Sequence, residues 1–131
     1  MKRFLFLLLI AFVGIFATKA QNLRFNSKGE FKVAQFTDIH WTPGIAESEV
    51  QVPLMIDKIV KTEHPDVLIF TGDIVTAKPA MDAWKSFAKM CEQWGIPYAV
   101  TMGNHDPEMT SRDSIFTFLQ SQPLFIGEKG P

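Results

Sequence analysis

Three short polar segments of the chain carry side chains that can bind metal ions and move protons. They are Asp38-Ile39-His40, Gly72-Asp73 and Gly103-Asn104-His105-Asp106, and each follows an apolar run typical of a β-strand. Asp73 comes 35 residues after Asp38, and Asn104 comes 31 residues after Asp73. Because ligands gather beyond the carboxyl ends of the strands in open α/β sheets, we expect these side chains to meet at one sheet edge. Such oxygen and nitrogen ligands suit a pair of divalent metal ions that hydrolyse phosphate esters.

Each segment by itself also has an ordinary structural explanation. Asp38 and His40 fit a loop aspartate followed by a surface histidine, while Asp73 fits a helix cap after a glycine turn. Asp38 and His40 are two residues apart, so in an extended chain both side chains would point the same way and could reach one metal ion. Three such segments in this order, each behind a strand and separated by one helix, favour a common site.

The third segment is the most specific of the three. Asn104 offers a neutral carbonyl oxygen, which suits a site that already holds carboxylates. We expect His105 to point at the substrate and Asp106 to hold one ring nitrogen of His105, which would fix the tautomer of the imidazole. A histidine held in this way can donate a proton to a leaving oxygen.

The elements that must position these segments alternate between strands and helices, which predicts an α/β fold with a mainly parallel sheet and crossover helices. We expect strands over residues 31–37, 67–70 and 96–101, and the start of another over 124–126. Helices are expected over residues 50–60, from Pro79 to just before Gly95, and over 111–120. Residues 23–25 would pair with the strand over 31–37 in a hairpin around the turn at 26–29, or they would form an edge strand that leads into a central strand over 31–37. Val52, Met55, Ile56 and Ile59 form the predicted apolar stripe of the first helix.

Five single residues carry predictions about packing or exposure. Pro53 fits only near the first turn of its helix, and Thr110 is the candidate N-cap of the last helix. Cys91 lies at helical spacing from large apolar residues, which indicates a core position and not a reactive thiol. His64 is expected to be a solvated surface residue. Trp41 either packs under the following loop or lines the site, and we favour packing.

The first 20 residues have the pattern of a secretory signal peptide. The basic pair Lys2-Arg3 precedes an apolar run over residues 4–17, and small residues lead to an expected cut after Ala20. The run is shorter than the roughly 20 residues of a membrane span, although an uncleaved N-terminal anchor is the alternative. We therefore expect a secreted or periplasmic protein with no membrane span in its mature chain.

The remaining residues, 21–131, are expected to form one small domain. Removal of residues 1–20 takes away three basic side chains, so the net charge changes from −1 to −4. This balance lacks the basic footprint of a nucleic-acid-binding protein. No nucleic-acid partner is therefore expected, and the metal-ligating segments make a phosphate ester the expected partner.

Together, the three segments resemble the first three signature blocks of the calcineurin-like metallophosphoesterases. The resemblance covers roughly residues 30–126, and the residues around Asp38 and Asp73 are similar to the forms in secreted bacterial members. It implies an α-β-β-α sandwich, of which this chain holds mainly the N-terminal β-α-β-α-β half. It also implies hydrolysis of phosphate mono- or diesters by metal-bound hydroxide.

The resemblance further implies a role for each site residue. Asp38 and His40 would bind one metal ion, Asp73 would bridge two ions, and Asn104 would bind the other ion. The two divalent ions would be Mn, Fe or Zn. His105 would assist the leaving group, with Asp106 behind it.

The chain also departs from the family pattern. The later Gly-His and Gly-His-x-His blocks, which supply three more histidine ligands, are absent. We therefore expect residues 21–131 to be the N-terminal portion of a longer enzyme, weak in metal binding and activity by itself, with a C-terminal half supplying the histidines. Purple acid phosphatases carry a tyrosine three residues after the bridging aspartate, where this chain has Thr76, so an iron–tyrosine site is not expected.

Two alternatives remain open at this level. The chain could be a non-catalytic exported binding or structural module, or a degenerate remnant of such an enzyme. It could also pair with a separate polypeptide that supplies the missing histidines. The substrate is open as well: monoester, diester, nucleotide and lipid head-group phosphates all fit.

Overall fold

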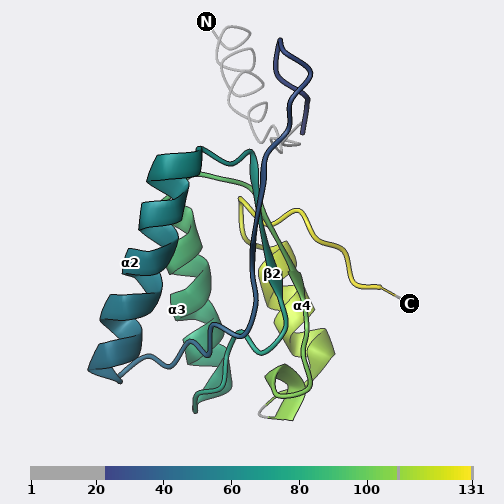
Figure 1. The fold of residues 1–131 in the computed structure, drawn as a ribbon. Coiled ribbons are helices and arrows are strands. Elements are labelled where there is room, and N and C mark those ends of the chain that lie inside the picture. The colour runs from purple at the N-terminus through teal and green to yellow at the C-terminus, as the bar shows by residue number, and fades with distance from the viewer. Residues whose placement is uncertain (1–22, 109, 131) are drawn as a thin grey trace, which may run out of the picture.

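The structure is a computed structural model that describes residues 23–108 and 110–130, so the predicted signal peptide over residues 1–20 lies outside the described part. Strands and helices alternate along the chain (Figure 1). They are β1 (Val33–Phe36), α2 (Ala46–Glu63), β2 (Val67–Thr71), α3 (Ala80–Glu92), β3 (Tyr98–Thr101), the 3₁₀ helix η1 (Asp106–Glu108) and α4 (Arg112–Gln120). This order confirms the α/β class and the β-α-β-α-β half that the sequence predicts.

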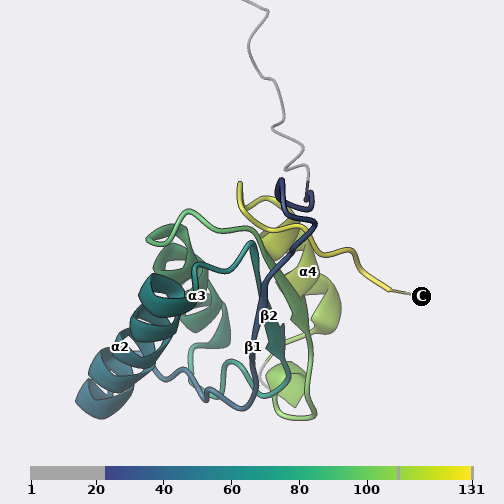
Figure 2. The ribbon, with the colours of Figure 1, turned by 45° about the horizontal axis from the view of Figure 1, so that its top comes forward.

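The three strands form one parallel sheet in the order β1-β2-β3. Phe36 pairs with Phe70 and Thr71 with Thr101, so all three strands end at the same edge. The crossover helices α2 and α3 lie next to each other beside the sheet (Figures 1 and 2). Short strands joined by whole helices are what parallel pairing requires, because a tight turn cannot return the chain in the same direction.

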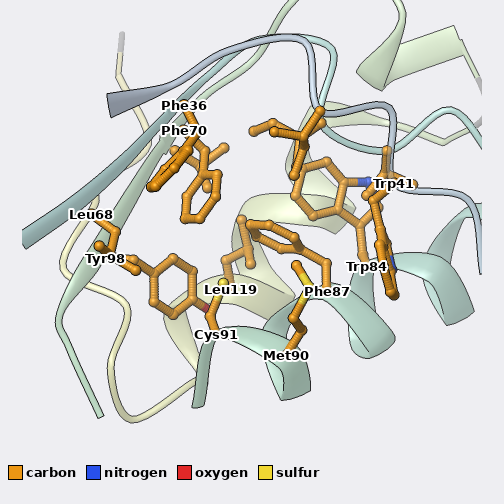
Figure 3. Close-up of a cluster of buried hydrophobic side chains, with 14 of the residues drawn as sticks. Phe36, Trp41, Leu68, Phe70, Trp84, Phe87, Met90, Cys91, Tyr98 and Leu119 are labelled. Carbon is orange, nitrogen blue, oxygen red and sulfur yellow. The ribbon is translucent and has the colours of Figure 1, made fainter. Parts of the chain in front are cut away.

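The core lies on one face of this sheet. Phe36, Phe70 and Tyr98 alternate with exposed or half-buried residues along their strands and point at α3 (Figure 3). Phe70 contacts Phe87 of α3 edge to face, with 4.9 Å between ring centroids. Edge-to-face contacts of this kind add roughly 0.5–1.5 kcal/mol to the burial of the rings. Leu119 of α4 is buried in the same cluster.

The opposite face of the sheet is more open. Gln35 of β1 and Thr101 of β3 are exposed, and Ile69 and Ala99 between them are half-buried. A second sheet of a sandwich is not present among residues 23–108 and 110–130.

The N-terminal hairpin prediction is wrong in part. Asn26 makes the predicted turn, because its side-chain oxygen accepts hydrogen bonds from the backbone N–H groups of Lys28 and Glu30 at 2.9 and 3.0 Å. Residues 23–25 form no strand, however, and β1 begins only at Val33. β1 is an edge strand of the described sheet, so the alternative that residues 31–37 form a central strand is wrong too.

Helix α2 starts earlier than predicted, at Ala46, so Pro53 lies inside the helix and the prediction that it lies near the first turn is wrong. The early start has a local cause: Glu49 accepts a hydrogen bond from the backbone N–H of Gly44 at 3.0 Å, and Ser48 accepts one from that of Thr42 at 2.9 Å. Acidic residues in the first turn also suit the positive end of the helix. Most of the predicted apolar stripe is confirmed, because Ile56 is fully buried and Val52 and Ile59 pack against the core, but Met55 is exposed.

The other boundaries shift by a residue or two. Ser111 and not Thr110 caps α4, since its hydroxyl accepts a hydrogen bond from the backbone N–H of Ser114 at 3.1 Å. The expected strand over residues 124–126 is reduced to a single bridge between Phe125 and Tyr98. None of the described helices combines the length and the hydrophobicity that crossing a membrane would require.

The predictions for Cys91, His64 and Trp41 are confirmed. Cys91 is buried, and burial raises the pKa of its thiol well above the ordinary value, with the nearby Glu92 carboxylate raising it further. His64 is exposed at the end of α2. Trp41 is buried beside Trp84 of α3 (Figure 3).

Candidate metal centre

The predicted site forms at the carboxyl edge of the sheet. Beyond the strands the chain continues in register: the backbone N–H of Asp38 donates to the carbonyl of Gly72 at 3.1 Å, and the N–H of Gly72 donates to that of Thr101 at 2.8 Å. Each chain segment that leaves a strand therefore runs beside the segment that leaves the neighbouring strand. This pairing brings the first two polar segments to one place, as their position behind neighbouring parallel strands predicts.

Asp38, His40 and Asp73 come together at this edge. Each offers one ligand atom, and these atoms all lie within 4.8 Å of one another. Two carboxylates and an imidazole, partly open to solvent, match the oxygen and nitrogen donors that Mn, Fe and Zn accept. The donor set thus fits a divalent cation.

The reason that Asp38 and His40 share the site differs from the prediction. They do not stand on extended chain: Asp38, His40 and Asp73 all have positive φ, at 52°, 46° and 47°. This left-handed region is uncommon for residues other than glycine and costs free energy. Two backbone hydrogen bonds hold the first loop in this shape, from His40 N–H to the carbonyl of Asp73 at 3.1 Å and from Trp41 N–H to that of Ile74 at 2.7 Å.

Two glycines let the second and third loops approach each other. A Cβ atom on Gly103 would lie 2.2 Å from the Oδ1 atom of Asp73, which is far inside contact distance. A Cβ atom on Gly72, whose φ is 86°, would lie 3.1 Å from the Cα atom of Gly103. The two glycines therefore allow the loops to lie in contact, because a side chain at either position would crowd the other loop. The Asp73 carboxylate occupies the space that a side chain on Gly103 would fill.

The third loop reaches the cluster through its backbone. The N–H of His105 donates a hydrogen bond to Oδ1 of Asp73 at 3.0 Å, which orients that carboxylate. Asn104 is the preceding residue and is exposed. Its role as a metal ligand stays a prediction.

Asp106 does not hold the ring of His105, and this part of the prediction is wrong. Its carboxylate is fully buried and accepts hydrogen bonds from the backbone N–H groups of Ile74, Val75 and Gly103, at 2.8 to 2.9 Å. A buried carboxylate needs such partners, since an unpaired one would cost several kcal/mol. Asp106 therefore joins the second and third loops from beneath the site.

The ring of His105 is held instead by Glu108. Its Nδ1 atom lies 2.9 Å from Oε1 of Glu108, one turn further along the chain. Together with His40 and Thr76, these two residues line a hollow of about 260 Å³. No sequence pattern singles out Glu108, although its position three residues after His105 matches the repeat of a 3₁₀ turn.

Trp41 is not among the residues that line this hollow. Its side chain is 5% exposed and packs in the core, so it contributes to the site by anchoring the loop that carries His40. Thr76 occupies the wall of the hollow and supplies a hydroxyl group, not a phenol.

Comparison with known proteins agrees with this arrangement. The family model described as calcineurin-like phosphoesterase matches residues 31–129, which include all the predicted site residues. No solved structure has significant similarity to the chain.

Several curated proteins are similar over most of the chain. The probable inactive purple acid phosphatase 28 of Arabidopsis thaliana is 29% identical over 126 residues, covering 83% of this chain and 32% of the relative. The probable inactive purple acid phosphatase 29 of the same plant is 28% identical, with 85% and 33% covered. Phosphatase DCR2 of Saccharomyces cerevisiae is 29% identical, with 70% and 18% covered.

The chain thus spans about a third of the length of the two plant relatives and less of the yeast one. The family model, the metal-ligand cluster and the order of the strands all point the same way. The chain belongs to the calcineurin-like phosphoesterase family.

Proposed function

We propose that this chain forms the metal-binding edge of an exported phosphoesterase that hydrolyses phosphate mono- or diesters at a two-metal site. The observation that supports this most strongly is the convergence of Asp38, His40 and Asp73, whose ligand atoms lie within 4.8 Å of one another. Strained backbone at all three residues adds support, because such strain is concentrated at functional sites.

In this proposal Asp38 and His40 would hold one divalent ion, Asn104 would hold a second, and Asp73 would contribute to both. Bound Mn, Fe or Zn would make hydroxide available at neutral pH and neutralise charge on the phosphate. Thr76 has no phenol oxygen to give ferric iron, so we expect no iron–tyrosine colour.

The hollow beside the cluster is the proposed place for the leaving group. His105 and His40 face it from different loops. His105 can donate a proton to the departing oxygen, while its backbone N–H keeps the Asp73 carboxylate in place. Asp106 supports the positions of His105 and Asp73, because its carboxylate binds the backbones of the two loops that carry them.

The activity proposed here is that of the whole protein. Because the chain spans about a third of its plant relatives, we propose that residues outside it supply further histidine ligands. Export by a signal peptide over residues 1–20 belongs to the same proposal. The acidic balance of the remaining residues favours a phosphate ester of small or lipid type over nucleic acid.

A non-catalytic module is the second candidate. It is favoured by one observation: the plant relatives carry the words "probable inactive" in their names. Against it stands the intact set of carboxylates and histidines, which a binding scaffold does not need.

The test is hydrolysis of an aryl phosphate by the full-length protein with Mn²⁺ added. We expect turnover that the change Asp73→Asn abolishes, together with a loss of bound metal, because the shared ligand loses its charge. Asp82→Asn is the matched control, since Asp82 is exposed on α3 and pairs with Lys85. Bound metal without any turnover would favour the non-catalytic module, and unchanged metal content in Asp73→Asn would remove Asp73 from the site.

A further inference from the structure

We propose that Glu108 is a positioning residue that fixes the imidazole of His105 in one tautomer and one orientation. The inference rests on the proposed function of His105 as the group that faces the leaving oxygen. Its starting observation is the 2.9 Å contact between Oε1 of Glu108 and Nδ1 of His105.

The backbone places the two side chains next to each other. Residues 106–108 form a single 3₁₀ turn, and the backbone N–H of Glu108 donates to the carbonyl of His105 at 3.1 Å. In a 3₁₀ turn, side chains three residues apart lie one above the other. The contact is therefore a direct result of the turn.

Contacts from other loops hold this turn in place. The buried carboxylate of Asp106 accepts hydrogen bonds from the backbone N–H groups of Ile74 and Val75 in the loop after β2, and from that of Gly103 within its own loop. The N–H of His105 is held by Asp73. With the backbone fixed in this way, only the χ angles of His105 remain free, and Glu108 restricts them.

The contact has a chemical consequence for the imidazole. A carboxylate accepts hydrogen bonds and does not donate them, so it selects the form in which Nδ1 carries the proton. Nε2 is then the ring nitrogen left for a substrate atom in the hollow lined by His40 and Thr76. It donates a proton to a leaving oxygen from the imidazolium form, in which both nitrogens carry protons, and the ring is left as the neutral Nδ1–H tautomer that Glu108 holds. A hydrogen-bonded partner of this kind is how proteins commonly fix the tautomer of a functional histidine.

Glu108 is also a favourable residue to test. Its side chain is 49% exposed, so replacing it leaves no buried charge or cavity. Glu108→Ala removes the hydrogen-bond acceptor, whereas Glu108→Gln keeps an amide oxygen that can accept the same bond. Glu63→Ala is the matched control, because Glu63 is a similarly exposed glutamate, 61% exposed, paired with Lys32 near the other end of the sheet.

The experiment compares these variants in the full-length protein by steady-state kinetics and by NMR of the ring nitrogens of His105. We expect Glu108→Ala to lower kcat about ten- to a hundredfold with little change in KM, as loss of an outer-shell partner commonly does. The Nδ1–H signature of His105 should be lost in the same variant. Glu108→Gln should recover both the signature and most of kcat, and Glu63→Ala should match wild type.

A double variant shows whether Glu108 acts through His105. In the background of His105→Ala, adding Glu108→Ala should cause no further loss of kcat. The proposal is overturned if the two losses multiply, or if Glu108→Ala leaves the ring nitrogen signals unchanged. The NMR readout does not need turnover, so it still decides the tautomer if the protein proves inactive and only the proposed function fails.

Discussion

The candidate metal-ligand cluster depends on three residues whose backbones adopt an unfavourable conformation. Asp38, His40 and Asp73 each have φ near +50°, a region that costs of the order of 1–3 kcal/mol for each residue outside glycine. The surrounding loops hold all three in this shape through backbone hydrogen bonds. Replacement of any of the three by glycine would relieve the backbone strain but would remove a ligand atom. The site therefore requires residues that are strained at these positions.

A substitution of His105 tests its role as a proton donor. We expect His105→Ala to lower turnover by roughly 10²–10⁴-fold, the usual range for general acid–base catalysis, while the metal ions stay bound. The measurement is kcat on an aryl phosphate together with metal content. His64→Ala is the control, because His64 is an exposed histidine at the end of α2. Loss of metal from His105→Ala would show that the imidazole is a ligand.

A substitution of Asp106 tests its role beneath the site. Asp106→Ala leaves the backbone N–H groups of Ile74, Val75 and Gly103 without their acceptor. Each unsatisfied buried donor costs about 1–3 kcal/mol, so we expect a loss of several kcal/mol in the free energy of unfolding, measured with urea. Asp82→Ala, at an exposed position, should change it by less than about 1 kcal/mol. Equal stability of the two variants would mean that Asp106 does not hold the loops.

At the scale of elements, the loops after β2 and β3 act as one unit. The Asp73 carboxylate occupies the space beside Gly103, and Asp106 connects the backbones of both loops. The strands only bring the loops near each other, and these contacts then set the position of the ligands.

The close fit of the two loops predicts the effect of a single methyl group. In Gly103→Ala the new Cβ would lie 2.2 Å from Oδ1 of Asp73, so the carboxylate must move away from the cluster. We expect metal affinity to fall at least about tenfold, as when an outer-shell partner is lost, measured by isothermal titration of Mn²⁺ into the full-length protein. Gly130→Ala is the control, since no atom lies within 4 Å of its added Cβ. Unchanged affinity in Gly103→Ala would contradict the predicted displacement.

At the scale of the whole molecule, one apolar core supports the site. Side chains from one face of the sheet meet α3 and α4 in a single cluster (Figure 3), and Trp41 extends the cluster toward the loop of His40. The position of His40 thus depends on the core as well as on the loop. The open face with Gln35 and Ile69 takes no part in this cluster.

The buried thiol of Cys91 predicts how stability depends on pH. Its pKa is raised in the folded state, so its contribution to stability is complete below the unfolded pKa of about 8.5 and is lost progressively above it. Between pH 8.5 and 9.5 the free energy of unfolding should fall by up to about 1.4 kcal/mol because of this group. Urea unfolding under reducing conditions measures the fall, and Cys91→Ala should show a shallower one. The same slope in both proteins would contradict the prediction.

Much of the fold follows from sequence patterns alone. Apolar runs of four to five residues separated by helical periodicity predict the strands, and their order predicts parallel pairing, because crossover helices join them. The boundaries of α2 and the absence of a strand over residues 23–25 could not be predicted. They depend on hydrogen bonds such as that from Gly44 to Glu49, which form only when the loop has its folded shape.

The family, the alternation of strands and helices and the meeting of Asp38, His40 and Asp73 follow from the residues alone, because side chains behind neighbouring parallel strands come to one sheet edge. The hydrogen-bond partners of Asp106 and His105, by contrast, depend on how the folded loops lie against one another. Ile74 and Val75 lie more than 30 residues from Asp106 along the chain, and no local pattern shows that their N–H groups point at its carboxylate. Because the carboxylate of Asp106 binds these N–H groups, it does not contact the ring of His105, and Glu108 contacts the ring instead.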